Sequence, residues 1–215
     1  MRAAAVWPKK LPKGRCSVLM LLLCGLVACR TDTLLRSTSE EWAFQQQYVN
    51  KSFYAAMVLR PYDYKDGYLI DLTGEIAAAA HETPRATITI PLGTPVTITA
   101  IDSQYVITHM HGHSRPFRFL LHTKHGTVSD VAEELQPALS DTPPLQAARP
   151  AMRPFISRQE VTHGMSQREI YMSWGQPDKA MSSPGASGFL EEWVYFDRRI
   201  HLFLHNGFLT NWQHF

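Results

Sequence analysis

Three histidines at alternate positions are the densest group of residues in the sequence with the chemistry to bind a metal ion: His109, His111 and His113. On a regular strand alternate side chains share a face, and imidazole is a common ligand of zinc and copper. However, residues 111–115 have the composition of a hairpin turn, and no carboxylate or cysteine lies nearby in the sequence. We therefore expect surface or turn histidines and no bound metal, with a metal site as the less favoured alternative.

The sequence contains no pattern of a common catalytic site. It lacks the Gly-x-Ser-x-Gly of serine hydrolases, a phosphate-binding loop and the glycine pattern of dinucleotide sites. Asp63, Asp66 and Asp71 lack the spacing and the terminal glutamate of a calcium-binding EF-hand loop, so a polar turn at Asp66-Gly67 is the simpler interpretation. We expect a protein that is not an enzyme and carries no cofactor.

The overall charge also restricts the function. The 215 residues are 45% hydrophobic and 19% charged, which is typical of a globular protein of one or two domains. The formal net charge is +2, but residues 1–28 contain five basic residues and no acidic one. The rest of the chain has 16 basic and 19 acidic residues, a net charge of −3. This balance argues against a nucleic-acid-binding protein that depends on a basic surface.

The first thirty residues have the pattern of an export signal. A basic stretch ends at Arg15, and an apolar run of 14 residues follows from Cys16 to Cys29. A spanning helix needs about 20 apolar residues, whereas the core of a signal peptide has roughly 7–15. All three cysteines lie in this leader or at its end, so its removal after Ala28 leaves one cysteine and no internal disulfide.

The end of the run, Leu26-Val27-Ala28-Cys29, resembles the lipobox of bacterial lipoproteins. The resemblance implies diacylglycerol on the Cys29 thiol, cleavage after Ala28 and acylation of the new amine, for example with palmitate. Several acyl chains anchor a protein stably. Residue 30 is arginine rather than aspartate, which in the family's sorting rule favours the outer membrane, facing the periplasm. An ordinary secretory signal that happens to contain a cysteine is the alternative.

The remainder of the chain predicts an α+β protein with two folded regions. Residues 29–41 are polar and indicate a tether. Within residues 42–135, apolar alternation at 87–90 and 96–101, with further strands at 105–110 and 117–122, indicates a small, mostly antiparallel sheet or barrel. Thr127 and Asp130 form a weak capping box for a short helix that ends at Pro137. Five of the 14 prolines lie within residues 136–155, which predicts an extended linker over 136–154.

Residues 155–215 give the clearest local signals. Ser166-Gln167-Arg168-Glu169 matches a capping box, and Gly175 and Pro177 mark the end of the helix. Strands are predicted at 190–196, 200–204 and 208–212. Asn206-Gly207 between the last two is a strong signal for a two-residue hairpin, because both turn residues need a positive φ.

That two-residue turn predicts the pairing of the last two strands. It places His205 opposite Phe208, Leu204 opposite Leu209, Phe203 opposite Thr210 and His201 opposite Trp212. One face then carries the aliphatic residues that pack against the helix: Ile200, Leu202, Leu204 and Leu209. The other face carries the candidate protein-binding residues: His201, Phe203, His205, Phe208 and Trp212. Such a face is too aromatic for a plain solvated surface, so it either binds a partner or packs against the preceding region.

Four short motifs in residues 155–215 together resemble the BamE (SmpA/OmlA) domain of small outer-membrane lipoproteins. They are Gly164-Met165-Ser166, Gly175-x-Pro177, Glu192-Trp193-x-Tyr195 and Phe203-x-x-Asn206-Gly207. The resemblance implies two short helices on a three-stranded antiparallel sheet, and an accessory role in the machinery that inserts β-barrel proteins into the outer membrane. It covers roughly 60 residues. A BamE protein is mostly that one domain, whereas here about a hundred residues separate it from the anchor.

Residues 42–135 resemble, more weakly, an SH3-like β module of some envelope lipoproteins. The resemblance rests on Ile90-Pro91-x-Gly93-Thr94-x-Val96-x-Ile98 and on Lys124-His125. Together the two resemblances imply a non-catalytic adaptor that binds envelope proteins, with barrel-assembly subunits among the candidate partners. The alternatives are an envelope protein that binds peptidoglycan through the SH3-like module and, less favoured, a metal-binding protein that uses the histidine group.

The lipidation of Cys29 is directly testable. We expect the amino-terminal peptide of the purified protein to begin at Cys29 and to carry the mass of its acyl chains. Cys29→Ser removes the thiol that accepts the lipid, so its peptide will carry none. Cys24→Ser, in the same leader, is the matched control and will be lipidated normally. An unmodified Cys29 in the wild-type protein, measured by mass spectrometry, would contradict the prediction.

Overall fold

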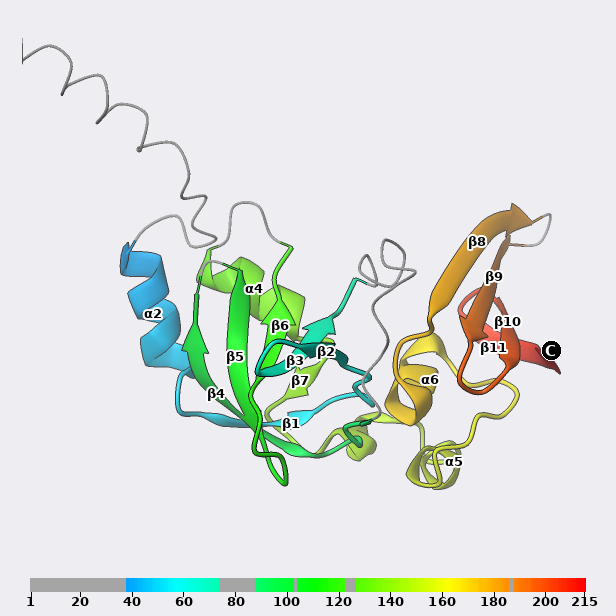
Figure 1. Ribbon diagram of the computed structural model, residues 1–215. Helices are drawn as coiled ribbons and strands as arrows, with labels where there is room; N and C mark the ends of the chain where they lie inside the picture. Colours follow the sequence, from blue (N-terminus) through cyan, green and yellow to red (C-terminus); the bar gives the residue numbers. More distant parts are fainter. Residues whose placement is uncertain (1–37, 74–87, 103, 123–126, 186–187) are drawn as a thin grey trace, which may run out of the picture. The chain divides into compact units, whose positions relative to one another are not determined.

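A computed structural model describes residues 38–73, 88–102, 104–122, 127–185 and 188–215 (Figure 1). These residues belong to one compact unit, Thr33–Phe215. The predicted signal peptide, Cys29, residues 30–37 of the predicted tether and His125 lie outside the described residues. None of the described helices is long and apolar enough to cross a membrane.

The described residues form a mixed α+β structure, mostly β, with four α-helices and two sheets. The first sheet has the strand order β2-β3-β6-β5-β4-β1-β7. Its neighbouring strands are antiparallel except for β3 and β6, which run parallel. The strands are β1 (Ser52–Ala55), β2 (Tyr62–Tyr64), β3 (Gly67–Asp71), β4 (Pro95–Ile101), β5 (Tyr105–Met110), β6 (Phe117–Leu120) and β7 (Leu139–Ser140). Helix α2 (Thr38–Tyr48) precedes β1, and helix α4 (Val128–Leu135) lies between β6 and β7.

Several local predictions for this region are confirmed, and two differ. The strand at 105–110 is β5, and Thr127 and Asp130 form the capping box of α4. Helix α2 begins inside the predicted tether, at Thr38. The alternation at 87–90 does not form a strand in its described part, because Ile90 makes only a single bridge to Leu59.

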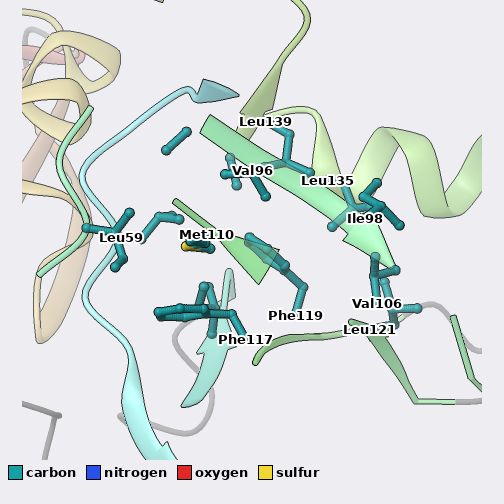
Figure 2. Close-up of a cluster of buried hydrophobic side chains, with 14 of the residues drawn as sticks. Leu59, Val96, Ile98, Val106, Met110, Phe117, Phe119, Leu121, Leu135 and Leu139 are labelled. Atoms are coloured by element: carbon teal, nitrogen blue, oxygen red, sulfur yellow. The ribbon is translucent and has the colours of Figure 1, made fainter. Parts of the chain in front are cut away.

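Alternating apolar residues of the first sheet build the first core (Figure 2). In β4, Val96, Ile98 and Ile101 are buried. Ile101 follows Ile98 by three residues rather than two, because the register shifts between Ile98 and Ala100. Phe44 from α2 and Leu135 from α4 belong to the same cluster. Full burial of a large apolar side chain contributes roughly 1.5–3 kcal/mol, so this core is the main stabilising feature of the region.

The second sheet has the strand order β11-β10-β9-β8, all antiparallel. Its strands are β8 (Lys179–Gly185), β9 (Gly188–Tyr195), β10 (Ile200–His205) and β11 (Phe208–His214), and they follow the helices α5 (Arg153–Ser157) and α6 (Gln167–Trp174). The prediction of a three-stranded sheet is wrong, because β8 adds a fourth strand at the edge. Its sequence, KAMSSPG, is exposed along almost its whole length and shows no apolar alternation that would identify a strand.

The proline-rich segment 136–154 is not an extended linker. It contains β7, the 3-10 helix η1 (Pro144–Ala147) and the first residues of α5. Pro144 and Pro154 lie in the first turns of η1 and α5, where the missing N–H of proline breaks no helical hydrogen bond. Leu139, Pro144 and Ala148 are buried, so this segment packs into the fold.

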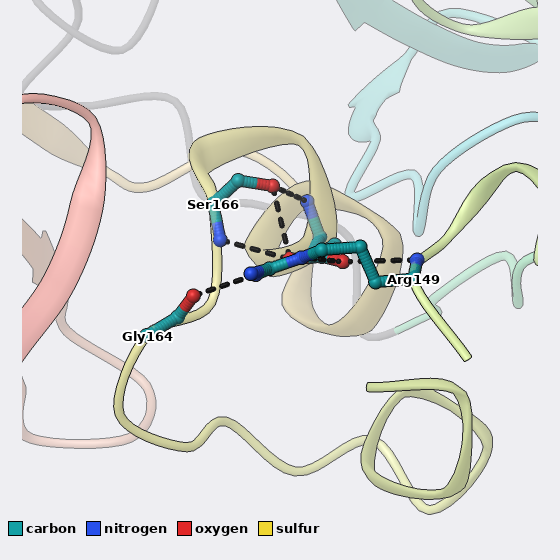
Figure 3. Close-up of polar contacts among 4 residues, drawn as sticks. Arg149, Gly164 and Ser166 are labelled. Atoms are coloured by element: carbon teal, nitrogen blue, oxygen red, sulfur yellow. Dashed lines mark hydrogen bonds and ion pairs between the residues drawn. The ribbon is translucent and has the colours of Figure 1, made fainter. Parts of the chain in front are cut away.

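A buried carboxylate joins this segment to α6. Glu169 is only 3% exposed and completes the predicted capping box with Ser166. Its carboxylate accepts hydrogen bonds from the Arg149 Nε (2.9 Å) and backbone N–H (3.1 Å), and from the Ser166 N–H (2.9 Å). The Arg149 Nη2 also pairs with Glu169 and donates to the carbonyl of Gly164 at 2.6 Å (Figure 3). Burial raises the pKa of Glu169, but these donors outweigh it and lower the pKa to about 2.

The other end of α6 contacts the first sheet region. The Val58 N–H donates to the carbonyl of Tyr171 in the last turn, at 3.1 Å. Gly175 follows the helix with a φ of 77°, and a side chain there would lie 2.3 Å from the Val58 carbonyl oxygen, so only glycine fits. Arg60 donates to the Gln176 carbonyl at 3.0 Å and forms ion pairs with Asp178 (3.3 Å) and Asp197 (2.8 Å).

The depressed pKa of Glu169 predicts an acid-sensitive contribution to stability. The folded pKa of about 2 lies below the ordinary value of 4.5, so the stabilisation is full above pH 5 and is lost as the pH falls towards 2. Glu169→Gln is expected to lower the free energy of unfolding by about 2–3 kcal/mol at pH 7, and wild type and variant will converge near pH 2. Denaturant titrations at several pH values measure this difference.

Glu160→Gln is the control for that experiment. Glu160 pairs with Arg158 at 3.0 Å, but both side chains are more than half exposed, so its loss will change stability little at any pH. If the loss of unfolding free energy in Glu169→Gln stays constant from pH 7 to pH 2, the low pKa assigned to Glu169 is contradicted.

Candidate protein-binding surface on the second sheet

The last hairpin begins as predicted. Asn206 and Gly207 have φ values of 50° and 78°, and His205 and Leu204 pair with Phe208 and Leu209. The turn is fixed to the start of α6, because the Gln167 N–H donates to the Gly207 carbonyl at 3.0 Å. The position of Phe208 is therefore set by the turn and by the helix together.

Beyond these two pairs the predicted register is wrong. A β-bulge lies between the pairs of Leu204 and Phe203, so Phe203 pairs with Asn211 rather than with Thr210. The extra residue is Thr210, whose hydroxyl donates to the Phe203 carbonyl at 3.0 Å. From there on each partner is shifted by one: His201 pairs with Gln213, and Trp212 pairs with Leu202.

The bulge moves Trp212 to the core face of the sheet. Directly paired residues of an antiparallel sheet share a face, and Leu202, the partner of Trp212, is fully buried. Trp212 packs against the second core, and its ring centroid lies 4.5 Å from that of His163. The structure therefore separates Trp212 from the other four residues of the predicted face, because a shift of one residue turns every later side chain over.

The remaining four residues share the outer face, the face opposite the second core, with side chains from β8 and β9. Glu192 pairs with Phe203, and Leu190 pairs with His205. Met181 of β8 pairs with Glu192. We call this set the outer face: Met181, Leu190, Glu192, His201, Phe203, His205 and Phe208. It includes a shallow pocket of about 290 Å³ lined by Met181, Leu190 and Phe203, among others.

Large apolar side chains of the outer face are exposed to solvent. The exposed fractions are 48% for Phe208, 49% for Leu190 and 40% for Met181. The alternative that the first sheet region covers this face therefore does not apply to these three residues. Several large exposed apolar groups on one face of a folded sheet are typical of an interaction site.

Polar contacts hold the ends of the outer face. The His201 ring pairs with the Glu192 carboxylate across β9 and β10, and Phe215 packs edge-on against His201 with ring centroids 4.8 Å apart. At the other end the Arg149 guanidinium lies 5.7 Å from the Phe208 ring centroid. Across the strands of this face polar and apolar side chains alternate: His205 lies between Phe208 and Leu190, and Glu192 lies between Phe203 and Met181.

Three members of this face were not predicted from the sequence: Met181, Leu190 and Glu192. For Leu190 and Glu192 a signal was available, since alternate residues of the predicted strand 190–196 must share a face. Met181 had no signal, because its strand was not predicted.

The three candidate metal ligands lie in three different local environments. His109 is exposed on β5, where it pairs with Thr97, and His111 is exposed in the turn after the strand. His113 packs edge-on against Phe117, with ring centroids 5.4 Å apart. Among the described residues no group of three or more His, Cys, Asp or Glu side chains is arranged to hold a metal ion.

One constellation of residues not singled out in the sequence has the residue types of a hydrolase triad. Asp71 is buried, and its Oδ1 lies 2.9 Å from the His122 Nε2, while the Thr73 hydroxyl lies 3.2 Å from the same nitrogen. A triad needs the carboxylate on one ring nitrogen and the hydroxyl on the other, so that the ring can take the proton. Both contacts here fall on Nε2, so the arrangement does not fit that chemistry.

No protein-family model matches this sequence, and the searches of curated proteins and of solved structures gave no significant match either.

Proposed function

We propose that the protein is a lipid-anchored envelope lipoprotein that acts as a non-catalytic adaptor and binds a partner protein through the outer face. The anchor is Cys29, and the proposed location is the periplasmic side of the outer membrane. The observation that carries the proposal is the exposure of Phe208, Leu190 and Met181 on one face of a sheet whose other face is the second core. Aromatic residues and methionine are enriched at protein interfaces relative to the rest of the surface.

The BamE-like resemblance gives the first partner to test, the β-barrel assembly machinery. Two features support it: α5 and α6 precede an antiparallel sheet, and the Asn206-Gly207 hairpin closes that sheet. The SH3-like interpretation of the preceding region is supported by the antiparallel run β4-β5-β6. The fourth strand β8 and the seven-stranded first sheet differ from what these two resemblances imply. Binding to a different envelope protein is therefore the competing outcome.

The experiment is photocrosslinking in native envelopes. A photoreactive phenylalanine analogue replaces Phe208 in the full chain, and the same analogue replaces Phe189 in a control. Phe189 is 64% exposed on the same sheet, but it directly precedes Leu190 in β9 and so lies on the opposite face. The affinity tag needs a long flexible linker, because the C-terminal Phe215 packs beside His201.

Adducts at Phe208 that contain barrel-assembly subunits, and are absent at Phe189, would support the adaptor and its partner. Adducts with another envelope protein would keep the adaptor and replace the partner. Cell-wall fragments alone, or equal adducts at both positions, would contradict the proposal.

With the partner identified, substitution of Phe208 gives the quantitative test. Phe208→Ala is expected to weaken binding by about 2 kcal/mol, because a large exposed aromatic side chain is lost from the binding face. Phe189→Ala removes an equally large ring from the other face and will leave the affinity unchanged. Binding curves for both variants, with thermal melts to show that they fold, check the prediction. A folded Phe208→Ala protein that binds normally would contradict it.

A further inference from the structure

A second candidate site lies on the core face of the second sheet, where Trp212 is placed by the bulge. A pocket of about 470 Å³ opens between the loop after α5, the end of α6 and the last two strands. Its walls include Val161, Trp174, Ile200 and Trp212, and its charged residues are Glu160 and Arg198. This volume lies within the range of about 300–1,000 Å³ that is usual for small-molecule sites.

The two indole rings of the pocket are fixed by contacts within the protein. The Trp174 Nε1 donates to the Gln159 carbonyl at 2.7 Å, and Trp212 packs against His163. Binding of a ligand to these rings would therefore cost little side-chain entropy, which favours affinity.

The Arg198 guanidinium is the group with unused binding capacity. Its carbon lies 4.4 Å from the Trp174 ring centroid, and among the described residues no carboxylate or carbonyl accepts a hydrogen bond from it. The adjacent Asp197 pairs instead with Arg60 at 2.8 Å, and Glu160 pairs with Arg158 at 3.0 Å. Arg198 is exposed as a whole residue, but partial burial of its guanidinium lowers its pKa.

We propose that this pocket binds a carboxylate attached to an aromatic or branched apolar group, with the carboxylate on Arg198 and the apolar group against Trp174 and Trp212. A guanidinium binds a carboxylate through two parallel hydrogen bonds, and indole rings pack well against aromatic groups. A free aromatic acid and the carboxyl-terminal residue of a polypeptide share this chemistry. The pocket and the outer face are on opposite faces of the sheet, so this site does not depend on the adaptor function.

The test is ¹⁹F NMR of the full chain in detergent with 5-fluorotryptophan in place of tryptophan. The probe is N-acetyl-L-phenylalanine, and its carboxamide analogue is the matched neutral ligand. We expect the Trp174 and Trp212 signals to shift with a common Kd, while the signal of Trp42, in α2, stays fixed. The amide is expected to bind about tenfold more weakly or worse, because it lacks the charge that Arg198 recognises.

Two variants separate the role of Arg198 from a general loss of positive charge. Arg198→Gln is expected to weaken binding of the acid about tenfold or more, whereas Arg168→Gln, an exposed site on α6 outside this pocket, will not. If Arg198→Gln fails to fold, the comparison of acid and amide binding to the wild-type chain still tests the proposal. Equal binding of acid and amide, normal binding by a folded Arg198→Gln protein, or no shift at either tryptophan would overturn the proposal.

A peptide that ends in a free phenylalanine carboxylate distinguishes the two ligand sources. Tighter binding than that of N-acetyl-L-phenylalanine would support the carboxyl end of a polypeptide, and loss of the peptide's binding on amidation would support it further. Weaker binding of the peptide would support a small free acid.

Discussion

The Glu169 carboxylate is buried at the start of α6, and the fold tolerates this charge only because donors from two segments surround it. Ser166 supplies its backbone N–H and hydroxyl, and Arg149 supplies its guanidinium and backbone N–H. Removal of one partner from a buried ion pair leaves an uncompensated charge, which costs far more than the pair contributes. Because Arg149 lies in the proline-rich segment, this requirement fixes that segment to the helix, and the segment cannot act as a free linker.

Helix α6 is also the element that the two cores share. Tyr171 packs against both clusters of buried residues, and its carbonyl accepts the Val58 N–H. At this end of the helix the constraint is steric, since a Cβ at Gly175 would overlap the Val58 carbonyl oxygen. The Arg60 ion pairs with Asp178 and Asp197 add charge complementarity beside that contact. The two sheets therefore meet through a short helix whose two ends are constrained by different physical effects.

Features that depend on neighbouring residues could be predicted from the sequence, and features that depend on distant partners could not. The capping boxes at Thr127 and Ser166 and the hairpin at Asn206-Gly207 are encoded within four residues, and the structure confirms them. The edge strand β8 was missed because an exposed strand needs no apolar alternation. The packing of segment 136–154 was missed because it depends on Arg149 meeting Glu169, 20 residues further along the chain. Four of the seven residues of the outer face were predicted, and Trp212, beyond the bulge at Thr210, was assigned to the wrong face.

That bulge explains why one aromatic cluster in the sequence corresponds to two sites in the structure. With regular pairing, His201, Phe203, Phe208 and Trp212 would form one exposed patch. The extra residue at Thr210 leaves Phe208 on the outer face and turns Trp212 towards the core face, beside Trp174 and Arg198. Because bulges disrupt a strand locally and redirect side chains, they are frequent near functional sites. A single inserted position thus allows opposite faces of one small sheet to carry a flat apolar surface and a pocket with the Arg198 guanidinium on its wall, which suit ligands of different size.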